Sequence, residues 1–141
     1  SILIPKTNLA CPKISSMTME RTPCFGVCPY YKITLFEDGR IFYHGKKDTP
    51  RIGQFEGRIS AVEAKRILNK FAKKKVDVAP DEYKFVSRDI SLLNFNFIIN
   101  KKNKTINKAN FGPAYFEHLA KELDAIAEKV TWQKAIDNDL E

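Results

Sequence analysis

Two cysteines spaced four positions apart are the residues whose type and spacing could do chemistry in this sequence. Cys24 and Cys28 lie in a loop containing proline and glycine, just before a segment with the alternation of a β-strand. This spacing can close a small disulfide, supply part of a metal site or present a reactive thiol. A disulfide would imply an oxidising compartment, so the three hypotheses place the protein in different surroundings.

A metal site or a thiol nucleophile would need partners from elsewhere in the chain. Zinc would require Cys11 and His44 to join the two loop cysteines, and the sequence has no second closely spaced Cys or His pair. A catalytic thiol would need His44 or His118 beside it. Neither arrangement follows from the spacing, so we expect no metal and no cofactor and assign no catalytic residue.

Dithiol redox catalysis is a more specific hypothesis for the same loop than a structural disulfide. A dithiol catalyst commonly has the spacing Cys-x-x-Cys at a helix start, whereas the loop has one residue more and no evident helix begins at Cys24. Arg21 could supply the cation that stabilises a thiolate. Cys11 is left as the odd cysteine, either free or paired with one of the other two. Lipidation of Cys11 is a third alternative, which the short apolar segment before it disfavours.

The composition is that of one folded domain with a basic surface. The chain has 141 residues, of which 43% are hydrophobic, and a net charge of +7 from 24 basic and 17 acidic residues. No run of about 18 apolar residues is present, so we expect no membrane span. Lysine dominates the basic residues, which is typical of a solvated surface or one attracted to an acidic ligand.

Hydrophobic periodicity predicts an α+β fold with an antiparallel β-sheet, in the order strands, helix, strands, helix, covered on one face by two helices. Ser60 to Glu63 has the pattern of a capping box, and Gly112-Pro113 precedes the second helix. We expect an N-terminal extension over residues 1–13, a single α+β domain over 14–132 and an acidic tail over 133–141. The expected strands cover residues 14–20, 31–36, 40–45, 51–59, 92–99 and 105–111, and the expected helices cover 60–75 and 113–130.

The lysines on the first predicted helix and near residues 101–108 also raise the possibility of nucleic-acid binding. Aromatic residues on a sheet, such as Phe42 and Tyr43, can stack bases. However, no ribonucleoprotein signature is present, and lysines on an exposed helix face usually serve only solubility. We therefore rank nucleic acid third among the candidate functions.

The residues around the cysteine loop resemble a bacterial domain family of unknown function, whose members are often found in chains with signal or lipoprotein sequences. Its signature, Cys-x-Gly-x-Cys-Pro-x-Tyr, is matched from Cys24 to Tyr31. A Gly-x-Ile-Ser segment leading into a helix is matched by residues 57–60, and an Asp-Glu-Tyr segment is matched by residues 81–83. The similarity spans residues 17–132.

The resemblance implies an extracytoplasmic protein, periplasmic or secreted, and supports a disulfide between Cys24 and Cys28. It carries over no catalytic residue, because no activity of the family is known. We expect a non-catalytic binding or interaction module for an unknown protein or acidic ligand, with an oligomeric state that the sequence does not indicate. The candidate binding surface comprises Arg21, Phe25, Phe42 and His44. The alternative is a thiol-dependent redox or hydrolytic enzyme centred on Cys24.

Overall fold

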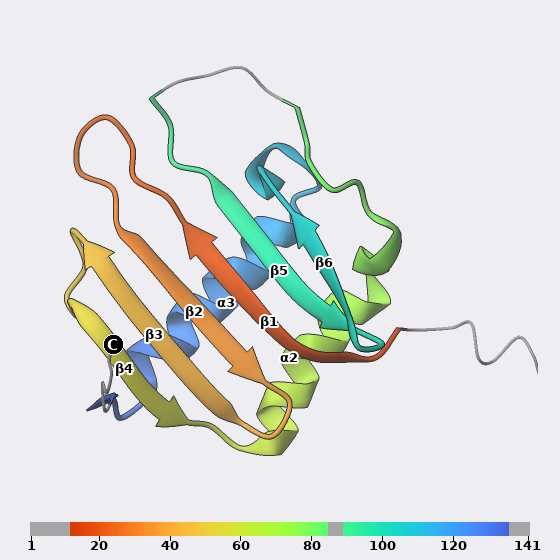
Figure 1. Ribbon diagram of the computed structural model, residues 1–141, viewed down its shortest axis with the longest axis horizontal. Coiled ribbons are helices and arrows are strands. Elements are labelled where there is room, and N and C mark those ends of the chain that lie inside the picture. Colours follow the sequence, from red (N-terminus) through yellow and green to blue (C-terminus); the bar gives the residue numbers. More distant parts are fainter. Residues whose placement is uncertain (1–11, 85–88, 136–141) are drawn as a thin grey trace, which may run out of the picture.

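The computed structural model describes residues 12–84 and 89–135, and its main component is a seven-stranded antiparallel sheet (Figure 1). The strands lie side by side in the order β6-β5-β1-β2-β3-β4-β7. Their bounds are β1 Ile14–Arg21, β2 Tyr30–Phe36, β3 Arg40–Lys47, β4 Gly53–Arg58, β5 Leu93–Ile99, β6 Lys102–Ile106 and β7 Gln133–Lys134. The first four strands follow one another as a meander, and β5 then pairs with β1 rather than with its neighbour in sequence.

Two α-helices and two short 3-10 helices complete the described fold. The α-helices are α2, Ala61–Lys73, and α3, Tyr115–Lys129; the 3-10 helices are η1, Val76–Val78, and η2, Ala109–Phe111. Ser60 caps α2, because its side chain accepts a hydrogen bond from the amide of Glu63. The Glu63 carboxylate binds Arg66 instead, so only half of the predicted capping box has formed.

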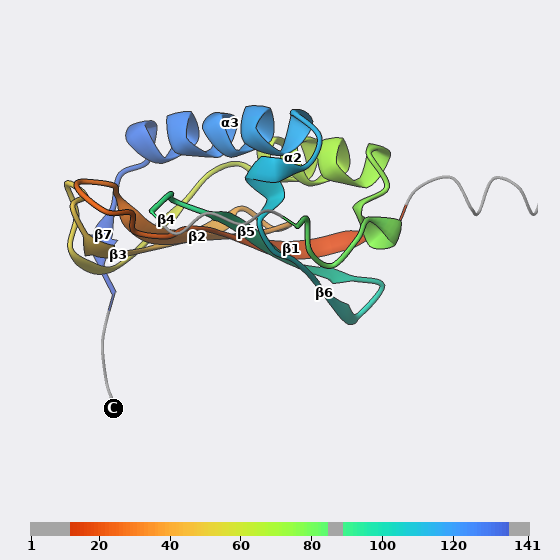
Figure 2. The same cartoon turned by 90° about the horizontal axis from the view of Figure 1, so that it is seen from above.

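The hydrophobic core lies between the sheet and the helices, which are on the same side of it (Figure 2). Alternation along the strands sends every second side chain into this layer, as in the facing pairs Met17 with Phe97 and Met19 with Phe95. Phe71 from α2 and Phe116 from α3 pack against Phe95. The described residues include no helix that is long and apolar enough to cross a membrane.

The predicted fold class is wrong in the proportion of strand to helix and in the order of the elements along the chain. The protein is mainly a seven-stranded antiparallel sheet and is only 28% helical. Four strands come before the first helix, and the chain returns to the sheet as β7 after α3, where we expected a helix to end the fold. The two helices also do not form the cover alone: η1, η2 and the ring of Trp132 pack against the same core. A two-residue strand such as β7 has too few residues to show periodicity.

The second hairpin also differs from its expected bounds. We expected a turn over residues 100–104 and a strand over 105–111. Instead Asn100 and Lys101 form a tight turn with φ angles of 50° and 68°, and β6 begins at Lys102. Two residues with positive φ are what a two-residue hairpin needs, and asparagine accepts this conformation readily. The division into 1–13, 14–132 and 133–141 stays a prediction, with β7 inside the expected tail.

Candidate functional site

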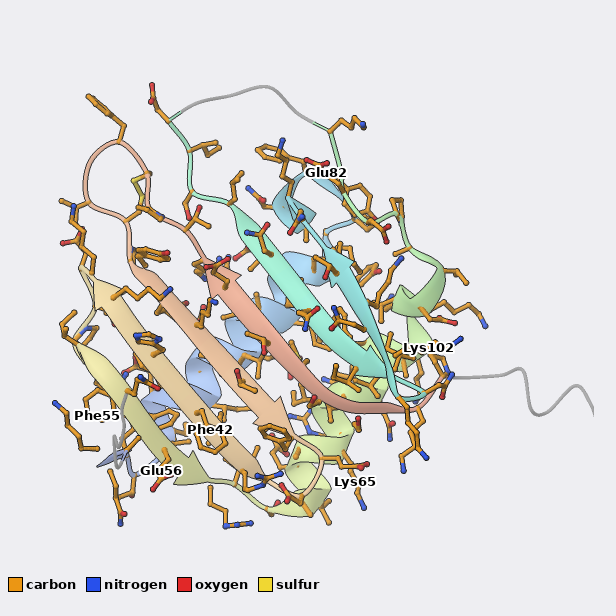
Figure 3. The ribbon with its side chains drawn as sticks, viewed as in Figure 1. Phe42, Phe55, Glu56, Lys65, Glu82 and Lys102 are labelled. Carbon is orange, nitrogen blue, oxygen red and sulfur yellow. A yellow bond between two sulfur atoms is a disulfide. The ribbon has the colours of Figure 1, made fainter. Side chains whose placement is uncertain are left out.

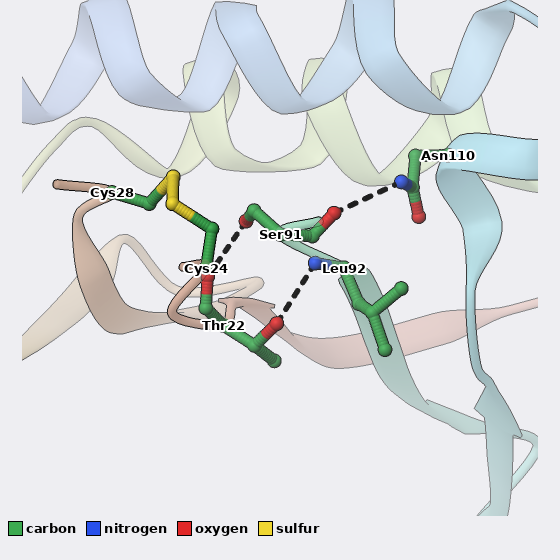
Figure 4. The surroundings of a disulfide bond; sticks show 6 residues. All are labelled: Thr22, Cys24, Cys28, Ser91, Leu92 and Asn110. Atoms are coloured by element: carbon green, nitrogen blue, oxygen red, sulfur yellow. Dashed lines mark hydrogen bonds between the residues drawn. A yellow bond between two sulfur atoms is a disulfide. The ribbon is translucent and has the colours of Figure 1, made fainter. Parts of the chain in front are cut away.

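The cysteine loop is closed by a disulfide between Cys24 and Cys28, whose Cα atoms lie 5.5 Å apart (Figure 4). The loop joins the end of β1 to the start of β2. Its base is tied to β5 through Thr22, whose backbone amide donates to Leu92 and whose hydroxyl accepts from the Leu92 amide. Ser91 donates to the Thr22 carbonyl, and Asn110 donates to the Ser91 carbonyl. The staple and this network hold the loop to the end of the sheet.

The tip of the loop exposes two large apolar side chains to solvent. Phe25 and Val27 are each 84% exposed, which makes them the most exposed large hydrophobic residues in the described chain. Such side chains cost solubility and often mark contact surfaces when they cluster. Phe25 was predicted as part of the binding surface, and the structure places it at the tip of the loop.

The staple makes a measurable contribution to stability. We expect the double variant Cys24→Ser/Cys28→Ser to lose about 2 kcal/mol of unfolding free energy, because a loop this short restricts the unfolded chain modestly. Urea denaturation of the oxidised wild type and the variant measures the difference. A wild type that loses as much stability on mild reduction would agree with this account, and no loss in either case would contradict it.

Arg21 lies on the helix side of the sheet, and not on the face that carries Phe42 and His44. It occupies the last position of β1, on the same side as Met17 and Met19. Its guanidinium binds Glu117 and Asp124 of α3, each at 2.9 Å, and its Nε donates to the Tyr31 hydroxyl at 2.9 Å. Tyr31 in turn donates to Asp124. Arg21 therefore joins sheet to helix within a polar cluster of Arg21, Tyr31, Glu117 and Asp124.

The pKa shifts in the polar cluster keep both Tyr31 and Arg21 protonated. Burial raises the pKa of Tyr31 above its usual value, and the hydrogen bond to Asp124 adds to this. Burial lowers the pKa of Arg21, but the hydrogen bond with Glu117 and the nearby negative charges outweigh burial and raise it overall. Both groups thus keep their protons across the physiological pH range, and the cluster fits a structural role better than proton transfer.

Sequence reasoning missed Glu117 and Asp124 as partners of Arg21. Their spacing of seven places them on one side of α3, and this was the signal available in the sequence. The separation from Arg21 in sequence exceeds ninety positions, so the pairing itself depends on how α3 lies over β1 and β2.

The opposite face of the sheet carries Phe42 and His44, and Figure 2 shows no described helix on this side. Phe42 contacts Phe36 edge to face, with ring centroids 5.8 Å apart, and the Arg40 guanidinium lies 4.2 Å from the centre of the Phe36 ring. Figure 3 shows Phe42 near the middle of β3, on the face turned toward the reader, away from α2 and α3. We call this side the open face.

Three basic groups gather beside Phe42 on the open face. Lys32 on β2 is directly opposite His44 on β3, and Lys46 follows two residues later on the same side. Burial lowers the pKa of His44, and the positive charges of Lys46 and Lys32 lower it further. A hollow of about 330 Å³ lies here, lined among others by Lys32, Phe42, His44 and Gln54.

Phe42 also borders a second hollow, of about 760 Å³, at the β4 edge of the sheet. Arg40, Arg58 and Lys129 bring positive charge to this hollow, whereas Glu56 and Glu63 bring negative charge. The Phe42 ring therefore stands between two concave regions. Of the predicted surface residues, the structure brings Phe42 and His44 together, places Phe25 on the loop tip and separates Arg21 from them.

The groups considered for metal binding or thiol catalysis are not assembled in the described residues. No set of three or more His, Cys, Asp or Glu side chains there could hold a metal ion. The sulfur atoms of Cys24 and Cys28 are bonded to each other, and His118 lies exposed on α3. Cys11 lies outside the described residues.

An antiparallel sheet with one face packed against helices and one open face, joined to a disulfide-closed loop, defines a small α+β domain. The chain belongs to a family of domains of unknown function, DUF6438, whose model matches residues 15–127. No curated protein and no solved structure matches the chain. The match covers β1 to α3, and thus both the cysteine loop and the open face.

Proposed function

We propose that this protein is a non-catalytic binding or interaction module that works outside the cytosol, in the periplasm or after secretion. The open face, together with the stapled loop, would be its binding surface. The observation that carries the proposal is the contrast between the two faces. One face is packed against the helices, and the other presents Phe42, His44 and a hollow that no described helix covers. The larger hollow lies at the β4 edge, where Glu63 of α2 and Lys129 of α3 also line it.

The disulfide supports the location. Short-range disulfides persist in oxidising compartments and are rare in the cytosol, where thiols are kept reduced. The same bond supports binding over thiol chemistry, because an enzyme centred on Cys24 needs a free thiolate and this sulfur is bonded to Cys28. The exposed tip residues Phe25 and Val27 add apolar contact area at the end of the sheet.

Nucleic-acid binding through the lysine-rich helix receives less support. Arg66 forms ion pairs with Glu63 and Glu122, and Lys70 also binds Glu122. Two of the four basic residues of α2, Arg66 and Lys70, are therefore paired with carboxylates of α2 and α3. Nucleic-acid binding requires basic side chains that neutralise phosphates and so release the counterions held by the nucleic acid, and side chains already paired with carboxylates do this less well.

The test is a binding panel with matched variants. Immobilised wild-type protein is exposed to peptides, neutral and acidic oligosaccharides, lipid vesicles and oligonucleotides. Phe42→Ser on the open face and Lys65→Gln on the exposed side of α2 are tested in parallel (Figure 3 labels both positions).

We expect a ligand class that the wild type and Lys65→Gln retain and that Phe42→Ser loses. Binding that depends on Lys65 and not on Phe42 would contradict the proposal. So would turnover of any probe that is lost when Cys24 is replaced.

A further inference from the structure

The open face gathers three basic groups around one site, those of Lys32, His44 and Lys46. Lys32 and His44 occupy directly opposing positions on β2 and β3, where a protonated imidazole would face the Lys32 ammonium unfavourably. The Lys46 ammonium lies over the Tyr30 ring, 4.8 Å from its centre. This contact does not neutralise the positive charge of Lys46. In the part of the chain that the structure describes, none of these three groups forms an ion pair.

The charges on neighbouring strands cancel this group only in part. Glu20 on β1 is directly opposite Lys32 and accepts a hydrogen bond from Asn94, so its carboxylate offsets part of the Lys32 charge. On β4, the residue opposite His44 is the uncharged Gln54. The next residue of that strand on this face, Glu56, stands opposite Phe42. The His44 imidazole is therefore flanked by the ammonium groups of Lys32 and Lys46, and its neighbour on β4 is the uncharged amide of Gln54.

Phe42 gives the site an apolar platform. The ring borders the hollow beside His44 and also the larger hollow beside Arg58. The larger hollow turns around the sheet edge to Glu63 and Lys129 of the helices, so the smaller hollow on the open face is the one beside the basic groups. Further along the sheet, hydroxyl and amide groups pair across strands, as Thr18 does with Thr34 and Thr105 with Asn96. These neutral polar groups suit the hydroxyls of a sugar chain.

We infer that the open face binds an acidic polysaccharide, with a uronic-acid carboxylate held by Lys32, His44 and Lys46 and a sugar ring lying on Phe42. The inference rests on the proposed function and names its ligand class. Lysine and histidine beside a flat ring suit a single carboxylate on a ring. A phosphodiester chain would call for unpaired arginines, whereas Arg40 is bonded to the Asp38 carboxylate and Arg58 to the Asp38 carbonyl.

The site has a defined pH dependence. The pKa of His44 lies below its usual value in the free protein because of burial and of Lys46 and Lys32. A bound carboxylate reverses part of that effect and raises the pKa, so by linkage the ligand binds more tightly as the imidazole gains its proton. Affinity therefore rises as the pH falls from 8 to 5, a range over which a uronic acid stays ionised.

The experiment is calorimetric titration of the folded chain with tetragalacturonate, with neutral maltotetraose and oligothymidylate as comparison probes. We expect affinity for tetragalacturonate to rise by about fivefold between pH 8 and pH 5. Lys32→Gln should bind about tenfold more weakly. His44→Gln should bind without this pH dependence, and Lys65→Gln should match the wild type. Circular dichroism and thermal melting confirm that each variant is folded.

Three outcomes overturn the inference: no binding of tetragalacturonate, equal binding of maltotetraose, or tighter binding of oligothymidylate through the same residues. Each is distinguishable from failure of the proposed function. If another class of ligand binds and depends on Phe42, the open face remains the binding surface and only the ligand class is wrong. If no probe in the panel depends on Phe42, both proposals fail.

Discussion

Replacing Phe95 by alanine is expected to lower the free energy of unfolding by about 4 kcal/mol, because the change removes a fully buried ring and leaves a cavity. The Phe95 ring contacts three others, those of Phe71, Phe97 and Phe116, at centroid distances of 5.3–5.6 Å. These rings come from β5, α2 and α3, so the cavity would weaken the contact between the sheet and both helices.

Urea denaturation of Phe95→Ala measures this loss, and Phe25→Ala is its matched control. Phe25 is 84% exposed, and its replacement should change stability by less than about 0.5 kcal/mol. The same substitution thus separates a core ring from a surface ring in one protein. Equal effects at the two positions would contradict the described layer arrangement.

Replacing Arg21 by leucine is expected to cost about 2 to 3 kcal/mol of stability, since Glu117 and Asp124 then lose the cation between them. The cost stays below that of a fully buried pair because both carboxylates are 34% exposed and remain partly solvated. The change also removes the donor to the Tyr31 hydroxyl. The measurement is again the midpoint of urea denaturation.

Removal of the unpaired charge tests the cause of this loss. In the Arg21→Leu background, Asp124→Asn should recover about 1 kcal/mol, because it removes one of the two uncompensated carboxylates. Arg58→Leu, on the open face, is the control and should change stability by less than about 0.5 kcal/mol. If Asp124→Asn adds a further loss to the Arg21 variant, the polar cluster does not act as an ion pair between sheet and helix.

The local elements could be predicted from the sequence, because their signals are local. Alternation located β2 and β3, the Asp38-Gly39 turn joined them, and helical periodicity located α2 and α3. The hairpin over Asn100 and Lys101 was placed wrongly, since several polar residues there could form the turn.

The arrangement of these elements was less predictable. Pairing of β1 with β5 joins residues about eighty positions apart, and no local pattern specifies it. For the same reason Arg21 was assigned to the binding surface, although it is the last inward-facing residue of β1 and contacts α3. Phe42 and His44 were assigned to the open face from alternation alone, and their side chains do lie together there.

The most direct test of the open face as the binding surface is the amide NMR spectrum of the labelled protein during titration with tetragalacturonate. We predict that shifts concentrate on β2, β3 and β4 around Lys32, Phe42, His44 and Gln54, with α2 and α3 unaffected. Shifts concentrated on the two helices would contradict the account, because they would place the binding surface on the opposite side of the sheet.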